Sequence, residues 1–140
     1  MNKYLTLKEK HQKEVNDFPF FFAFSNEQFE EGIKSFGLQP KETDKIYKFG
    51  NTGGFYKRED SNKLNEMFER HEKEVEKARK DYEYLVQMFK YELANHEYNY
   101  TRDIVPTIQA LGLSVSEVKK NRKLLKALTE ALNILKEGEE

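Results

Sequence analysis

The sequence predicts an α+β fold in which a small three-stranded antiparallel sheet packs with about five helices. Three observations predict it. An almost continuous aromatic run, Phe-Pro-Phe-Phe-Phe-Ala-Phe, occupies residues 18–24 of a chain that is 35% charged. Two short aromatic runs flank the glycine-rich stretch at residues 50–54. Capping signals followed by apolar residues at helical spacing fill much of the remaining chain.

The first strand is expected at residues 20–24. The aromatic run is too short for an ordinary helix and suits a strand with both faces covered, so its even-numbered phenylalanines would point to one side and Phe21 and Ala23 to the other. Residues 45–49 and 54–58 then form a hairpin across Gly-Asn-Thr-Gly-Gly. Because an isolated hairpin is marginal in water, the phenylalanine run is its natural third strand.

Capping-box spacings, in which Ser or Thr is followed three residues later by Glu or Gln, mark three helix starts. Thr6 predicts a helix from Leu7 to about residue 16. Ser25 predicts a second helix that ends before Gly37. Ser114 predicts a last helix whose leucines pack on the sheet.

Two further features predict helix boundaries after residue 95. Thr101 is a candidate N-cap for a helix through Leu111, with Pro106 in its first turns because proline cannot donate a backbone hydrogen bond. The helix that follows Ser114 is expected to be interrupted at Asn121.

A long heptad-patterned helix is expected from residue 61 to about residue 94. A straight helix of this length would measure about 50 Å, longer than a small domain. The apolar stripe is thin between Arg70 and Asp81. We therefore expect a bend near Lys80 and Asp81, and a monomer ahead of a homodimer joined along the stripe.

Composition bounds the class of protein. One hundred and forty residues fit a single domain over residues 1–140. The absence of cysteine excludes disulfides, a cysteine nucleophile and thiolate metal sites, and it fits a cytoplasmic protein. The chain has 24 basic and 25 acidic residues, so its net charge of −1 gives no overall attraction to nucleic acid or to a membrane. No apolar run approaches the length of a membrane span.

The segments 20–32, 45–58 and 91–101 resemble a family of small proteins of unknown function from gut-type anaerobic bacteria. Proteins of that family are often associated with mobile genetic elements. The resemblance implies a cytoplasmic accessory protein. It implies no activity, cofactor or catalytic residue.

The hairpin supplies the first candidate binding residues. The amides of the turn at residues 50–54 could face a phosphate, although the turn precedes a strand and lacks the lysine of a P-loop. A plain hairpin turn is the simpler interpretation. The candidates here are Asn51, Thr52, Tyr56 and Arg58.

Histidines supply the second set. His96 and Glu97 form a possible acid–base pair at a helix end, but adjacent helical residues point about 100° apart, so a helix cap beside a solvated carboxylate is the simpler interpretation. His71 lies on the apolar stripe without a second histidine at metal-ligand spacing, and a histidine at the core edge is expected there. We expect no metal, no cofactor and no enzymatic activity.

The third set is basic. Residues 111–118, followed by a run of lysines and arginine, resemble a helix-turn-helix with a basic second helix. Ile108 stands where such a motif has a small residue, and the basic cluster falls on the expected interruption. The candidates here are Lys119, Lys120, Arg122 and Lys123.

Together these observations predict a non-enzymatic protein that binds a partner, with a protein as the expected partner. Modulation of a host complex, such as a defence or replication complex, is a role consistent with the resemblance. The alternative is a nucleic-acid-binding regulator that uses the basic C-terminal region.

Overall fold

The computed structural model describes residues 1–138 and confirms the α+β class. Its backbone forms two compact units, which we describe separately: the sheet unit (His11–Glu72) and the helical unit (Met1–Lys10 and the chain from Lys73 onward). A single domain over residues 1–140 stays a prediction. In chain order the elements are α1 (Lys3–Asp17), β1 (Phe20–Phe22), α2 (Asn26–Ser35), η1 (Thr43–Lys45), β2 (Ile46–Phe49), β3 (Gly54–Lys57), η2 (Arg58–Asp60), α3 (Ser61–Ala78), α4 (Tyr82–Asn95), α5 (Tyr98–Thr101), α6 (Val105–Ala110), α7 (Val115–Lys120) and α8 (Arg122–Gly138).

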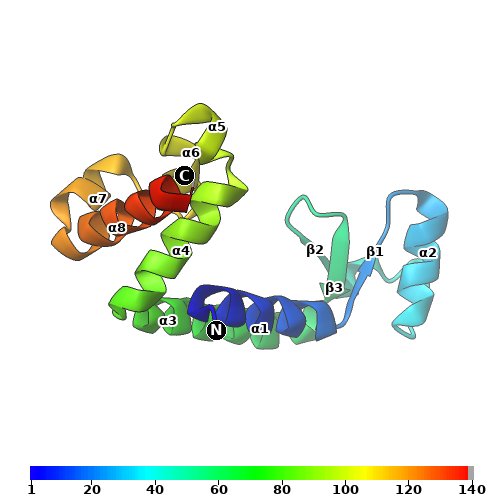
Figure 1. The fold of residues 1–140 in the computed structure, drawn as a ribbon. Helices are drawn as coiled ribbons and strands as arrows, with labels where there is room; N and C mark the ends of the chain where they lie inside the picture. The colour runs from blue at the N-terminus through cyan, green and yellow to red at the C-terminus, as the bar shows by residue number, and fades with distance from the viewer. Residues whose placement is uncertain (139–140) are drawn as a thin grey trace. The chain divides into compact units, whose positions relative to one another are not determined.

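The predicted sheet is confirmed. Its three strands are antiparallel in the order β1-β3-β2, so the phenylalanine strand pairs with the second arm of the hairpin. The register places Phe20, Tyr56 and Tyr47 in one row across the sheet. Figure 1 shows the sheet with α2 beside β1, the element with which α2 makes its contacts.

The first strand is shorter than predicted and only one of its faces is covered. It ends at Phe22, and the Phe24 side chain is 78% exposed. Phe22 is itself 56% exposed, whereas Phe21 is buried. The expectation of a strand buried on both sides was therefore wrong, because within the sheet unit α2 packs against the face of Phe21 alone.

The covered face forms the core of the sheet unit. The Phe21 ring stacks on Phe55 at 5.1 Å and meets Phe29 and Phe36 of the α2 segment edge-on. Gly32 makes this packing possible, since a Cβ atom there would lie 2.0 Å from Cδ1 of Phe21. The glycine thus brings the backbone of α2 down onto an aromatic ring.

One of the three helix starts predicted from capping boxes is wrong, and a second is capped differently from the prediction. α1 begins at Lys3 rather than Leu7, because the Asn2 side chain already accepts a hydrogen bond from the amide of Leu5 and the Thr6 hydroxyl donates to the Asn2 carbonyl. α2 starts as predicted, with Ser25 accepting from the amide of Gln28. The Gln28 side chain accepts from the Phe24 amide, so the box at Ser25 is only half formed.

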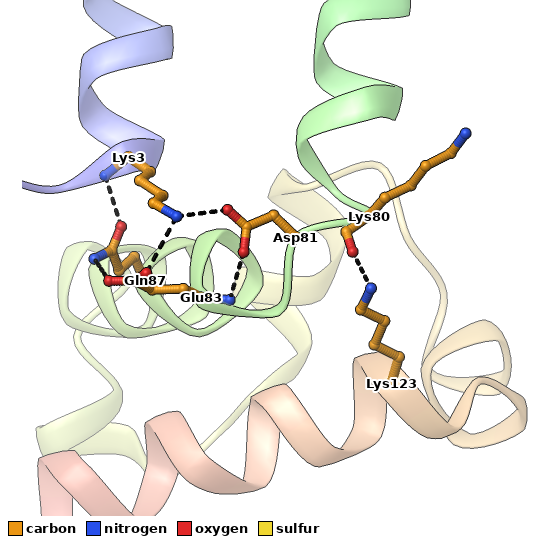
Figure 2. A network of polar contacts seen from close by, with 6 residues as sticks. All are labelled: Lys3, Lys80, Asp81, Glu83, Gln87 and Lys123. Carbon is orange, nitrogen blue, oxygen red and sulfur yellow. Dashed lines mark hydrogen bonds and ion pairs between the residues drawn. The ribbon is translucent and has the colours of Figure 1, made fainter.

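The predicted bend in the long helix is confirmed as a break between α3 and α4 (Figure 2). Asp81 caps α4 by accepting from the amide of Glu83. Lys3 of α1 lies 2.7 Å from the Asp81 carboxylate and 3.1 Å from that of Glu83. The hydrogen bonds from Lys3 lower the pKa of the Asp81 carboxyl. The break between α3 and α4 is therefore a defined turn, which the N-cap of α4 and the contacts of Lys3 stabilise.

The core of the helical unit lies between α4 and α8. Leu85, Phe89 and Leu93 of α4 are almost fully buried, as are Ala127 and Ala131 of α8. The leucines of the last helix therefore pack on α4, and the expectation that they pack on the sheet was wrong. That prediction failed because an apolar stripe shows that one face of a helix is buried, but it does not show which element packs against that face.

The segment between α4 and α8 mixes confirmed and wrong predictions. Thr101 ends the short helix α5 and does not cap a helix through Leu111. α6 begins at Val105, whose amide is capped by the Asp103 carboxylate, and Pro106 lies in its first turn as expected. The capping box at Ser114 is complete, and the predicted interruption at Asn121 separates α7 from α8.

No helix within residues 1–138 combines the length and the apolar character that a membrane crossing requires.

Candidate binding surface

The face of the sheet that α2 does not cover is entirely aromatic. In the register of the three strands, every non-glycine side chain on this side is a ring, and none is charged or aliphatic. Gly54 is the sixth position on this side. We call this surface the aromatic face, and it consists of Phe20, Phe22, Tyr47, Phe49 and Tyr56.

The rings of the aromatic face contact one another in a continuous array. Tyr56 stands at the centre, with its ring edge-on to Phe20 at 6.1 Å and to Tyr47 at 6.0 Å. Phe20 also stacks on Phe49 at 4.9 Å, and Phe49 stacks on Phe68 of α3 at 5.7 Å. These contacts hold the rings in defined orientations.

Part of the array remains open to solvent. Phe22 is 56% exposed and Tyr47 is 39% exposed, while Phe20, Phe49 and Tyr56 are half-buried. Phe24, which follows the strand, is 78% exposed and lies against Gly53. Clustered exposed aromatic side chains are unusual on a protein surface and mark interaction sites.

One cation lies on the aromatic face. The Arg58 guanidinium is centred 5.5 Å from the Tyr47 ring, a cation–π contact at the end of the hairpin away from the turn. Arg58 also lines a pocket of about 550 Å³ together with Lys45 and Lys57. The other residues of that pocket are Leu38, Asp44, Glu59, Ser61 and Asn62. Tyr56 and Arg58, both predicted as binding residues, thus lie on one surface.

Of the two candidate binding residues in the hairpin turn, Thr52 has a structural role. The Thr52 hydroxyl donates to the Phe49 carbonyl at 2.7 Å and accepts from the Gly54 amide at 3.0 Å. Thr52 therefore closes the turn. Asn51 is exposed beside it. The prediction of a hairpin turn is confirmed.

His71 belongs to a polar cluster between α1 and α3. Its ring stacks on His11 at 3.9 Å, and its Nε2 lies 3.1 Å from the Glu14 carboxylate. Arg70 also contacts that carboxylate, and hydrogen bonds from Arg70 and His71 lower the pKa of Glu14 from 4.5 to about 2. In the described part of the chain, no group of three or more His, Cys, Asp or Glu side chains could hold a metal ion. Here the cluster ties two helices together.

The structure does not bring His96 and Glu97 together as a pair. His96 Nε2 lies 3.3 Å from the carboxylate of Glu92, which is buried, and Glu97 is exposed with a left-handed backbone. Lys8 approaches the same Glu92 carboxylate at 3.3 Å. Burial and Glu92 raise the pKa of the nearby Tyr4 hydroxyl. The sequence analysis did not identify Glu92. Its position inside an apolar run was the only feature of the sequence that could have indicated a buried carboxylate there.

The basic C-terminal candidates lie in two different helices. Lys119 and Lys120 end α7, whereas Arg122 and Lys123 begin α8. The Lys123 ammonium donates to the carbonyl of Lys80 at the break between α3 and α4 (Figure 2). Lys123 thus caps the end of a helix.

The sequence contained a signal for the aromatic face that residue-by-residue reasoning missed. Pairing Phe49 with Gly54 across the turn forces Tyr47 opposite Tyr56 and leaves Lys48 and Phe55 on the other side. The alternation of the two arms therefore predicts which rings share a face once the turn is fixed.

Comparison with known proteins gives a family and no activity. Neither the curated proteins nor the solved structures include one that matches this chain significantly. A family model described as a family of unknown function (DUF7659) matches residues 3–133. The chain therefore belongs to this family of unknown function.

Proposed function

We propose that this protein acts by binding a partner macromolecule and not by catalysis, and that it does so through the aromatic face. The observation that carries the proposal is the ring array itself, in which Phe22 and Tyr47 stay exposed while their neighbours hold them in place. Aromatic side chains are enriched in the cores of interfaces because they bury large area at low entropic cost.

The biological setting is part of the same proposal. The resemblance to proteins of gut-type anaerobes and their mobile elements supports a cytoplasmic accessory role. The partner would then belong to a host complex, for example one of defence or replication. The balanced charge of the whole chain favours a protein as the partner, and it allows nucleic acid only where positive charge is local.

Affinity capture with matched variants tests the proposal. Tagged full-length protein would be incubated with extract of the source organism, with and without nuclease. Phe22→Ser combined with Tyr47→Ser should lose the captured partner. Tyr100→Ser is the control, because Tyr100 is 89% exposed and lies in α5 of the helical unit. Identical partners for all three proteins would contradict the proposal.

The alternative is nucleic-acid binding through the C-terminal region. The exposed side chains of Lys119, Lys120 and Arg122 support it, whereas the bond of Lys123 to Lys80 weakens it. Duplex DNA binding at low salt is the test, since phosphate contacts are then strongest. The alternative requires that Lys119→Glu combined with Lys120→Glu abolish binding. No duplex binding by the wild type would eliminate it.

A further inference from the structure

We propose that the ligand of the aromatic face is single-stranded nucleic acid, with its bases stacked on the exposed rings and its phosphates near Arg58. This inference rests on the proposed function, because it names the partner for the same surface. It differs from the C-terminal alternative in both the site and the form of the nucleic acid.

The first support is the chemistry of the face. All five non-glycine side chains on this side of the sheet are aromatic, so the surface offers flat rings and no aliphatic side chain. Bases have flat π-faces, and stacking on aromatic side chains is how sheet proteins bind single strands with little sequence preference. Gly54, in the middle of the face, allows the Phe22 ring to lie across β3, where a Cβ atom would come within 2.9 Å of it.

The second support is local charge. Residues 45–58 contain no acidic residue and four basic ones, in a chain whose net charge is −1. Lys45 and Lys57 are partnered by carboxylates outside this segment, at Glu42 and Glu59. Lys48 lies on the other side of the sheet, opposite Phe55, whereas Arg58 contacts the Tyr47 ring of the aromatic face. The aromatic face therefore carries the cation of Arg58 and no acidic side chain, which suits contact with a phosphate.

The same charge argues against a second copy of this chain on the aromatic face. Two aromatic faces brought together would bring two Arg58 cations into the interface, and neither face offers a carboxylate to pair with them. A single strand brings the opposite charge. A single strand also exposes its bases, whereas the bases of a duplex are stacked out of reach of a flat sheet.

The arrangement predicts which residues matter. Tyr47 serves both base stacking and phosphate contact. Its ring is 39% exposed, and the guanidinium of Arg58 lies over that ring. Phe22 supplies a second open ring. Loss of either ring should weaken binding about tenfold, the size of effect typical for one stacked base. Arg58→Ala should weaken binding. It should also make log K fall less steeply with log[salt], by the amount that corresponds to about one phosphate contact.

Fluorescence anisotropy with full-length protein tests this inference. The probes are labelled oligothymidine and oligouridine of about 20 nucleotides and a duplex of equal length, at low salt of about 50 mM. We expect the single strands to bind at least tenfold more tightly than the duplex. Tyr47→Ala and Phe22→Ala should each lose about tenfold in affinity. Tyr100→Ala, an equally aromatic and more exposed control, should bind like the wild type.

Two outcomes would overturn the inference. One is no single-strand binding by the wild type at low salt. The other is binding that Tyr47→Ala and Phe22→Ala leave unchanged while circular dichroism shows folded protein. If oligonucleotides fail but the double serine variant still loses a captured protein, the aromatic face binds a protein, so the inference falls and the proposed function stands.

Discussion

At the scale of single residues, neighbouring phenylalanines in one strand have opposite environments. Phe21 is buried against three rings, whereas Phe22 is 56% exposed. Phe21→Ala should cost about 3–5 kcal/mol, the range for truncating a core phenylalanine. Phe22→Ala should cost less, about 1–2 kcal/mol, since more than half of its area stays in water. Urea unfolding of both variants measures the difference, and equal losses would contradict the assignment of faces.

Gly32 tests how closely α2 packs on the sheet. In an open helix, Gly→Ala gains about 1 kcal/mol. Here the new methyl group would lie 2.0 Å from the Phe21 ring, so overpacking of about 1–3 kcal/mol opposes the gain. We expect the net effect of Gly32→Ala to be a loss of up to about 2 kcal/mol in the free energy of unfolding. Gly138→Ala is the control, because nothing lies within 4 Å of its Cβ position. A stabilised Gly32→Ala would mean that the helix can move away from Phe21.

Glu14 gives a prediction of pH dependence. Hydrogen bonds from Arg70 and His71 lower its pKa from 4.5 to about 2 in the folded protein. A lowered folded pKa contributes stability that is present above about pH 4.5 and is lost as the pH falls toward 2. Urea midpoints measured across this range should fall less steeply for Glu14→Gln than for the wild type. Glu72→Gln, an exposed position in α3, should keep the wild-type slope. Parallel slopes for wild type and Glu14→Gln would contradict the contacts at Glu14.

At the scale of elements, the capping box at Ser114 is the clearest case of a local signal that the structure fulfils. Its hydroxyl accepts from the Glu117 amide at 3.1 Å, and the Glu117 carboxylate accepts from the Ser114 amide at 3.2 Å. Ser114→Ala should therefore cost about 1 kcal/mol. Ser116→Ala, inside the same helix and exposed, should change stability by less than about 0.5 kcal/mol. Thermal unfolding of the two variants decides, and an equal effect would mean that the cap contributes nothing.

The elements that the sequence predicted well are those set by local chemistry. The hairpin follows from its glycine turn, the start of α2 from Ser25, and the break before α4 from a polar stretch with a capping aspartate. The two wrong capping predictions have one cause. Thr6 and Thr101 are plausible caps by type, but Asn2 and Asp103 provide competing caps a few residues away. Spacing alone cannot rank two adjacent capping residues.

At the scale of the whole molecule, the candidate site was less predictable than the fold. Tyr56 and Arg58 were predicted to bind, but the rings that accompany them come from two other strands. Their exposure depends on which face α2 covers, and that depends on long-range packing at Gly32. A period of two assigns residues to faces without saying which face is open.

Self-association is the last prediction at this scale. The heptad stripe between residues 64 and 93 would demand a second chain only if it lay on one straight helix of about 50 Å. The break divides it into α3, of 18 residues or about 27 Å, and α4, of 14 residues or about 21 Å. Both parts already have contacts within one chain: Phe68 of α3 stacks on Phe49 in the sheet unit, and α4 packs on α8 in the helical unit.

We therefore expect a monomer by sedimentation over about a hundredfold range of concentration, and no change in sedimentation on Val75→Asp. Val75 lies half-buried on α3, where the stripe is thinnest, so a charge there would separate any helical seam between two chains. Lys73→Ala is the matched control, because Lys73 is exposed two residues away. A dimer that Val75→Asp dissociates and Lys73→Ala preserves would show that the stripe is shared between chains in spite of the break.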